Sequence, residues 1–189
     1  MGKFVLGAKR PLIIAGPCSA ETREQTVETA MQLARSGRVD VIRAGVWKPR
    51  TQPGTFEGVG EPALEWLNEV KAATGLPIAV EVANRAHVEC ALRHGVDLLW
   101  IGARTTVSPF AVQEIAESLR GNKDVAVLIK NPMVPDINLW AGAVNRLIKE
   151  GIPAENIGLI HRGFSYFGRS KYRNPPMWHM IFEMRSRFP

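Results

Sequence analysis

Short apolar runs alternate along the chain with longer stretches of helical periodicity. Six runs rich in Val, Ile and Leu predict strands over residues 11–15, 39–44, 76–82, 96–101, 125–129 and 157–160. Within these runs apolar and polar residues rarely alternate, which is typical of strands buried on both faces of a parallel sheet. The pattern therefore predicts a parallel sheet covered by helices.

The stretches between the runs predict helices over residues 21–36, 61–74, 85–94, 109–119, 139–150 and 176–187. Ser19 or Thr22 is expected to cap the first helix, and a glycine follows each of the first five. Six βα units in a row indicate an α/β fold, either a (β/α)8 barrel or a doubly wound sheet. No Gly-x-Gly-x-x-Gly follows the first strand, which favours the barrel.

Composition narrows the class of protein. The chain has 189 residues and a formal net charge of +6, which suits either nucleic acid or small phosphorylated anions. Two cysteines do not make a disulfide framework, so a reducing cytoplasm is the expected location. No apolar run approaches the roughly 20 residues of a membrane span, so no membrane partner is expected.

Charged residues recur where the predicted strands end. In a parallel barrel the catalytic groups lie at the carboxyl ends of the strands. Glu81 lies on the third run, and six cations lie at these ends or in the loops that follow them: Arg43, Lys48, Arg50, Arg104, Lys130 and Arg162. Cations gathered in one place repel each other unless an anion neutralises them, and guanidinium groups bind phosphate and carboxylate well. The sequence thus predicts an anion-binding rim.

Four residues at or near this rim have more than one interpretation. Cys18, at a strand-to-helix junction, is either a metal ligand or nucleophile, or a small buried residue in a tight turn. Glu81 either pairs with a neighbouring cation or positions a water or a metal ion. Lys48 or Lys130 would exchange a proton near neutrality if burial lowered its pKa.

Four segments together resemble 3-deoxy-D-arabino-heptulosonate 7-phosphate (DAHP) synthases of the type Iβ group. They are Ala15-Gly16-Pro17-Cys18-Ser19, Arg43 with Lys48-Pro49-Arg50-Thr51, Ile101-Gly102-Ala103-Arg104, and Lys130-Asn131. The resemblance runs from about residue 10 to the end of the chain. The related 3-deoxy-D-manno-octulosonate 8-phosphate (KDO8P) synthases share the barrel but lack the Lys-Pro-Arg-Thr form, so they rank second.

The resemblance implies a transferase that condenses phosphoenolpyruvate with erythrose 4-phosphate to give DAHP and phosphate. This is the first step of the shikimate pathway to aromatic amino acids. The KDO8P-like alternative would use arabinose 5-phosphate instead. By resemblance, Cys18 is a metal ligand, Lys48 is a catalytic proton donor, and Glu81 lies near the water that attacks phosphoenolpyruvate.

The cationic residues receive substrate-binding roles by the same resemblance. Arg50 and Thr51 are similar to the site for the phosphate of erythrose 4-phosphate. The clamp for the phosphate and carboxylate of phosphoenolpyruvate is expected to comprise Arg43, Arg104, Lys130 and Arg162. Lys48 lies beside the reacting centre in this scheme.

The resemblance also implies a divalent metal ion (Mn, Fe, Zn or Co), a homo-oligomer and, in some members, a chorismate mutase module. The family completes its metal site with His, Glu and Asp from the last part of the barrel, so the site is expected to be incomplete here. Residues 1–189 are expected to form one partial barrel domain, truncated before strand seven and inactive alone. Two exposed sheet edges are expected to follow.

The segment from Arg162 to Phe167 is similar to an aromatic RNA-binding strand motif, and further cations follow it. The helix–strand alternation does not suit that small fold, so an RNA-binding protein is a minor alternative and no nucleic acid is expected. His161 is expected to be structural or to face substrate. His87 and His94, seven residues apart, are expected to be solvated or helix-terminal, and Cys90 to be a small core residue.

Overall fold

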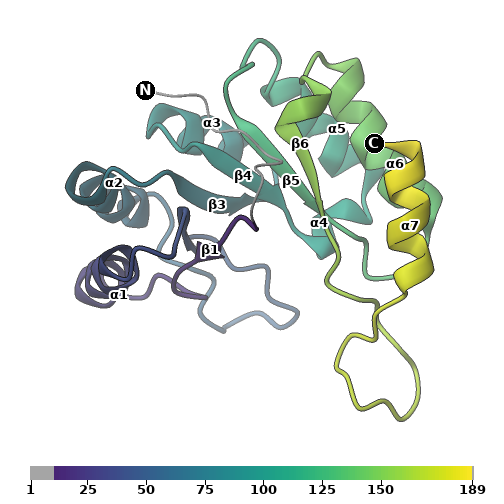
Figure 1. Cartoon of the computed structure of the whole chain (residues 1–189), viewed down its shortest axis with the longest axis horizontal. Helices are drawn as coiled ribbons and strands as arrows, with labels where there is room; N and C mark the ends of the chain where they lie inside the picture. Colours follow the sequence, from purple (N-terminus) through teal and green to yellow (C-terminus); the bar gives the residue numbers. More distant parts are fainter. Residues whose placement is uncertain (1–10, 189) are drawn as a thin grey trace.

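The computed structural model describes residues 11–188 as an alternation of strands and helices (Figure 1). Residues 1–10 and 189 of the expected 1–189 domain lie outside this range. The strands are β1 (Ile14–Ala15), β2 (Val41–Ala44), β3 (Ile78–Val82), β4 (Leu98–Ile101), β5 (Ala126–Lys130) and β6 (Ile157–Ile160). The helices are α1 (Arg23–Arg35), α2 (Pro62–Thr74), α3 (Arg85–Arg93), α4 (Ala103–Thr106), α5 (Pro109–Ser118), α6 (Ile137–Lys149), the 3-10 turn η1 (Ala154–Asn156) and α7 (Trp178–Arg187).

The strands form one parallel sheet in the order β1-β2-β3-β4-β5-β6, which is also their order along the chain. A doubly wound sheet would reverse its strand order at a switch point, whereas a barrel adds each strand beside the previous one. The fold is therefore six βα units of a (β/α)8 barrel, as the apolar runs predicted. The strands β1 and β6 form its two edges.

The two faces of the sheet have different neighbours. Every second strand residue, for example Ile42, Val80 and Ile129, packs with helix residues in the main hydrophobic core. The intervening residues form a smaller cluster made of strand residues only: Val41, Ala79, Leu98, Trp100, Ala126 and Leu128. The helices thus cover one face, and the other is the inner face of the barrel arc (Figure 1).

Side-chain caps explain where two of the helices begin. Thr22, one of the two expected caps, accepts a hydrogen bond from the Gln25 backbone N–H and starts α1. The helix α6 begins two residues earlier than predicted, because the Asp136 side chain accepts from the Leu139 N–H. The sequence pattern missed the short helix α4, which follows β4 directly. None of the helices formed by residues 11–188 combines the length and the apolarity needed to cross a bilayer.

Candidate active site

Strand register places charged residues on the inner face of the sheet. Arg43 lies between two core residues of β2, Glu81 between two of β3, and Lys130 follows Ile129 at the end of β5. Because side chains alternate along a strand, these three point to the face opposite the helices. Trp100 pairs in register with Glu81 and lies on the same face.

The three charged groups surround the Trp100 ring. The indole Nε1–H donates to Glu81 Oε2 at 2.7 Å, and Lys130 Nζ lies 3.6 Å from the same oxygen. The Arg43 guanidinium and Lys130 Nζ lie 5.5 and 5.3 Å from the ring centroid, within range of cation–π attraction. Burial lowers the pKa of Lys130, Glu81 opposes this, and the charges of Arg43 and Arg162 add to it.

A glycine makes room for the Glu81 carboxylate. A Cβ atom at Gly102 would lie 2.2 Å from Glu81 Oε1, far inside van der Waals contact. The glycine of the Ile-Gly-Ala-Arg segment is therefore needed where β4 ends, because any larger residue would push Glu81 away from Trp100 and Lys130.

We call the carboxyl ends of the strands, on the inner face of the sheet, the inner mouth. Cys18 and Lys48 form a second pair there. Lys48 Nζ donates to Cys18 O at 2.6 Å and lies 3.5 Å from Cys18 Sγ. Gly45 permits this approach, since a Cβ there would lie 2.0 Å from Cys18 O. The charge of Lys48 lowers the pKa of the Cys18 thiol, burial opposes that shift, and Arg43 contributes to it. Cys18 is exposed, so the tight-turn interpretation of a buried residue is wrong.

The lowered pKa of Cys18 gives a direct prediction. Iodoacetamide reacts with the thiolate, so Cys18 should be alkylated with a pH midpoint below that of an ordinary thiol. Lys48→Met should move this midpoint upward, because the thiolate loses its neighbouring charge. Mass spectrometry after timed alkylation measures the midpoint, with exposed Lys149→Met as the matched control. An unchanged midpoint in Lys48→Met would contradict the pairing.

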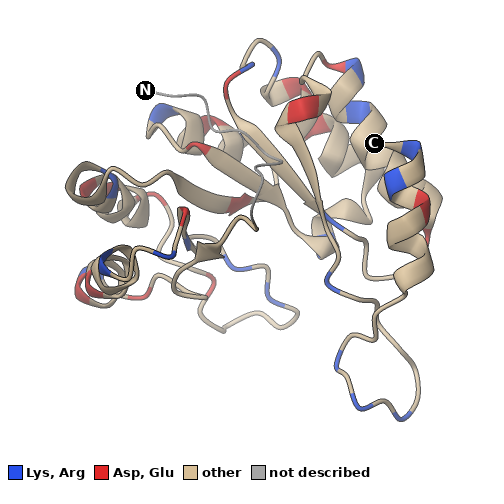
Figure 2. Cartoon of the chain, in the orientation of Figure 1, with Lys and Arg blue, Asp and Glu red and all other residues tan. Residues whose placement is uncertain are grey.

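The remaining cations follow the strand ends, Arg104 on α4 and the others on loops. Arg104 Nη2 donates to Thr51 Oγ1 at 3.5 Å, joining the end of β4 to the loop after β2. Burial and the charges of Arg104 and Arg173 lower the pKa of Arg162. Arg50 instead donates through Nε to Phe56 O within its own loop, so this contact does not tie it to the other cations. Figure 2 shows Lys and Arg segments along the loops after β2 and β6.

Sequence reasoning gave no role to two residues that build this site. From the sequence Trp100 was assigned to no site, although its alternation with the β4 core residues could have placed it on the inner face. Asn131 is fully buried: its Oδ1 accepts from the Arg162 N–H at 2.7 Å, and its Nδ2 donates to Pro132 O and Gly163 O at 2.8 and 2.9 Å. It thereby fastens the end of β5 to Arg162.

The residues present around Cys18 do not make a metal site. Between residues 11 and 188, one group of three His, Cys, Asp or Glu side chains is close enough to hold an ion, and it does not include Cys18. The charged neighbours of the Cys18 thiol are the cations Lys48 and Arg43.

His161 packs against Trp140, Phe164 and Trp178, and its Nε2 accepts from the Met177 N–H at 3.3 Å.

Two cavities bear on the location of the site. A pocket of about 240 Å³ adjoins the charged cluster and includes Lys48 and Glu81, with His87 stacked on Trp47 at 4.2 Å between ring centroids. A larger cavity of about 600 Å³ lies between β6, α6 and α7 and is mainly apolar, with Trp140, Ile157 and Met184 among its lining residues. Charge rather than size therefore makes the inner mouth the candidate anion-binding site.

Comparison with known proteins agrees with the barrel fold and with the resemblance to DAHP synthases. A family model described as "DAHP synthetase I family" matches residues 3–180. A phospho-2-dehydro-3-deoxyheptonate aldolase of Thermotoga maritima is 39% identical over 104 residues, which are 55% of this chain and 30% of that protein. A 2-dehydro-3-deoxyphosphooctonate aldolase of Methylobacillus flagellatus is 36% identical over 92 residues, 45% of this chain and 33% of the other.

Solved structures give the same result over nearly the whole chain. A crystal structure of the Thermotoga maritima DAHP synthase superposes with a TM-score of 0.79 at 27% identity, covering 97% of this chain and 53% of that one. A truncated form of the enzyme from the same organism gives 0.74 at 26% identity, covering 97% and 65%. The chain thus spans less than two thirds of the length of these relatives. With the matched family model, the barrel order of its strands and the charged inner mouth, the chain belongs to the DAHP synthetase I family.

Proposed function

We propose that the inner mouth of the sheet binds phosphoenolpyruvate and that the protein condenses it with erythrose 4-phosphate. The observation that carries this proposal is the group of cations on and around Trp100. Arg43 and Lys130 lie over the ring, and their charges, with those of Arg162 and Arg104, act on one another. A trianionic substrate would neutralise this repulsion, and bidentate guanidinium contacts suit its phosphate and carboxylate.

The proposed reaction joins the enol carbon of phosphoenolpyruvate to the aldehyde carbon of erythrose 4-phosphate. The aldehyde oxygen takes a proton and becomes a hydroxyl group, water adds to the carbon that carries the phosphate, and inorganic phosphate leaves. Lys48 is the proposed proton donor, and Glu81 is the proposed group beside the attacking water. The lowered pKa of Lys130 also makes its ammonium a better proton donor than an ordinary lysine.

Binding of the second substrate is proposed at the loop after β2. Thr51 accepts from Arg104 there, and Arg50 lies next to it in the chain. This loop would hold the phosphate of erythrose 4-phosphate close to the cluster around Trp100. Holding two anions together in one geometry is the main contribution such a site makes, because their repulsion opposes any encounter in water.

Phosphoenolpyruvate titration by calorimetry tests the proposal. We expect one binding site per chain and at least about tenfold tighter binding than pyruvate, since pyruvate lacks the phosphate and its charge-assisted hydrogen bonds. Binding should weaken as salt is raised, because salt screens the cations. Equal affinity for pyruvate and phosphoenolpyruvate would contradict an anion clamp at this mouth.

A second candidate is the KDO8P-type condensation with arabinose 5-phosphate. It is favoured by the similarity to two 2-dehydro-3-deoxyphosphooctonate aldolases, at 36% and 31% identity. Release of phosphate from phosphoenolpyruvate in the presence of each sugar phosphate separates the two candidates. In the whole protein we expect release with erythrose 4-phosphate and not with arabinose 5-phosphate, whereas residues 1–189 alone are expected to release none.

The remaining features implied by the family stay predictions. They are a divalent metal ion with Cys18 as one ligand of a site that is incomplete in this chain, a homo-oligomer, a cytoplasmic location, a chorismate mutase module in the whole protein, and a single partial barrel domain over residues 1–189. Size-exclusion chromatography with light scattering measures the oligomeric state of the chain directly.

A further inference from the structure

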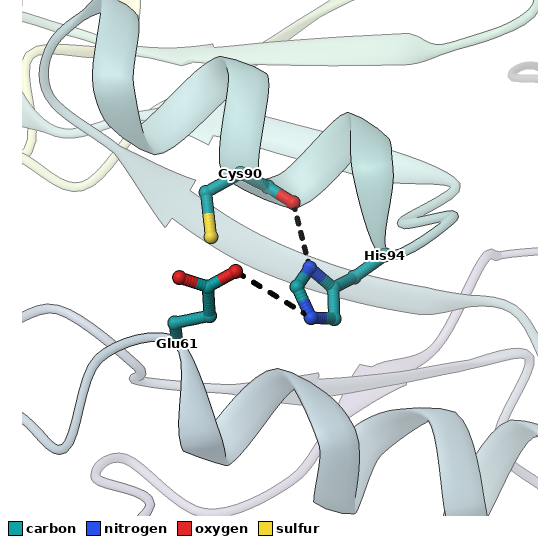
Figure 3. Close-up of side chains that lie close together, drawn as sticks. All are labelled: Glu61, Cys90 and His94. Atoms are coloured by element: carbon teal, nitrogen blue, oxygen red, sulfur yellow. Dashed lines mark hydrogen bonds and ion pairs between the residues drawn. The ribbon is translucent and has the colours of Figure 1, made fainter.

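Three potential metal ligands meet outside the site described above. Glu61 stands at the start of α2, Cys90 lies on α3, and His94 caps the carboxyl end of α3 (Figure 3). One ligand atom from each lies within 4.8 Å of the other two. The cysteine and the histidine are four residues apart, so their side chains lie on one face of the helix end. Cys90 is buried, His94 is half-buried and Glu61 is exposed.

The hydrogen bond of His94 leaves one ring nitrogen facing the cluster. Nδ1 lies 3.0 Å from Cys90 O, and a carbonyl oxygen only accepts, so Nδ1 carries a proton. Nε2 then points towards Glu61 Oε1, 3.8 Å away (Figure 3). Two acceptors at this distance repel unless a proton or a metal ion lies between them. A histidine that donates from one nitrogen to a backbone carbonyl is oriented to bind metal through the other.

We propose that Cys90 Sγ, His94 Nε2 and the Glu61 carboxylate bind one Zn²⁺ ion, with water as the fourth ligand. Thiolate, imidazole and carboxylate together favour zinc over the harder Mg²⁺ and Ca²⁺. On binding, the thiol proton of Cys90 passes to solvent and a sulfur–zinc bond replaces the S–H bond. The ion would link the start of α2 to the end of α3.

The cluster needs only a small movement to close around an ion. Ligand atoms about 2.0–2.3 Å from zinc in a tetrahedron lie closer together than 4.8 Å. The Glu61 side chain is exposed, so it can turn inward at little cost. Besides His94 and Cys90, the Glu61 carboxylate has a cationic neighbour in Arg93, whose Nη2 lies 3.5 Å from Oε1. Burial and Glu61 raise the pKa of Cys90, so without a metal this thiol stays protonated near neutrality.

Cobalt titration of the 189-residue chain tests this site. The Cys18→Ser background removes the other thiol, so that a thiolate–Co²⁺ charge-transfer band reports Cys90 alone. We expect one Co²⁺ per chain, displaced by one Zn²⁺. Cys90→Ala and His94→Gln should abolish the band, and Glu61→Gln should weaken affinity, measured by chelator competition, by at least about tenfold.

Two neighbouring variants serve as controls. Glu89→Gln alters an exposed carboxylate on the same helix and should leave the affinity unchanged. Arg93→Ala should tighten binding, because it frees Glu61. A missing band, or a band that survives Cys90→Ala and His94→Gln, would overturn the proposal. If those two variants fail to fold by circular dichroism, unchanged affinity in Glu61→Gln overturns it alone. None of these readouts depends on phosphoenolpyruvate binding.

Discussion

Replacing Lys130 with methionine is expected to weaken phosphoenolpyruvate binding by about 30- to 700-fold, or about 2 to 4 kcal/mol. The side chain is largely buried, and its ammonium lies 3.6 Å from Glu81 and 5.3 Å from the Trp100 centroid. Methionine keeps the length of the side chain and removes the charge. Both the attraction for the substrate and the neutralisation of Glu81 are lost. Calorimetric titration of the variant measures the change.

A double variant separates these two losses. In Lys130→Met with Glu81→Gln, no unpaired carboxylate remains, so thermal stability should return towards that of the parent chain. Affinity should recover only in part, since the cation is still missing. Lys149→Met, at an exposed position on α6, removes the same charge far from the inner face and should leave affinity unchanged. Full recovery of affinity in the double variant would show that Lys130 serves only to neutralise Glu81.

Replacing Asn131 with alanine is expected to cost about 3 to 5 kcal/mol of unfolding free energy. The buried amide makes three hydrogen bonds, and its loss leaves the Arg162 N–H and the Pro132 and Gly163 carbonyls without this partner. Urea denaturation followed by circular dichroism measures the change. Phosphoenolpyruvate affinity should also fall, because Asn131 positions the backbone of Arg162.

Asn156→Ala is the matched control for this prediction. Its side chain makes one hydrogen bond, from Nδ2 to Lys123 O at 2.6 Å, in a more exposed position. We expect a cost of about 1 kcal/mol or less, because water can replace the lost partner. Equal unfolding free energies for the two alanine variants would show that the Asn131 hydrogen bonds do not hold the end of β5 against the residues after β6.

The sequence alone predicted the parallel sheet, its six strands and the rim of charged residues. The apolar runs that predict strands and the glycines that end helices are local signals, because each depends only on residues close to it in the sequence. The site segments could be found for a related reason. Residues at the carboxyl ends of strands meet at one edge of a parallel sheet, so Arg43 and Lys130 were expected together before any register was known.

Only the tertiary structure decided which of these residues touch. Trp100 contacts Glu81 across 19 positions of sequence, and Arg104 reaches Thr51 across 53. Such pairs depend on strand register and loop path, because a shift of one residue turns each side chain to the other face. The same holds for Glu61 and His94, which come from two helices. Periodicity along one chain segment determined the elements, and the packing of distant segments determined the site.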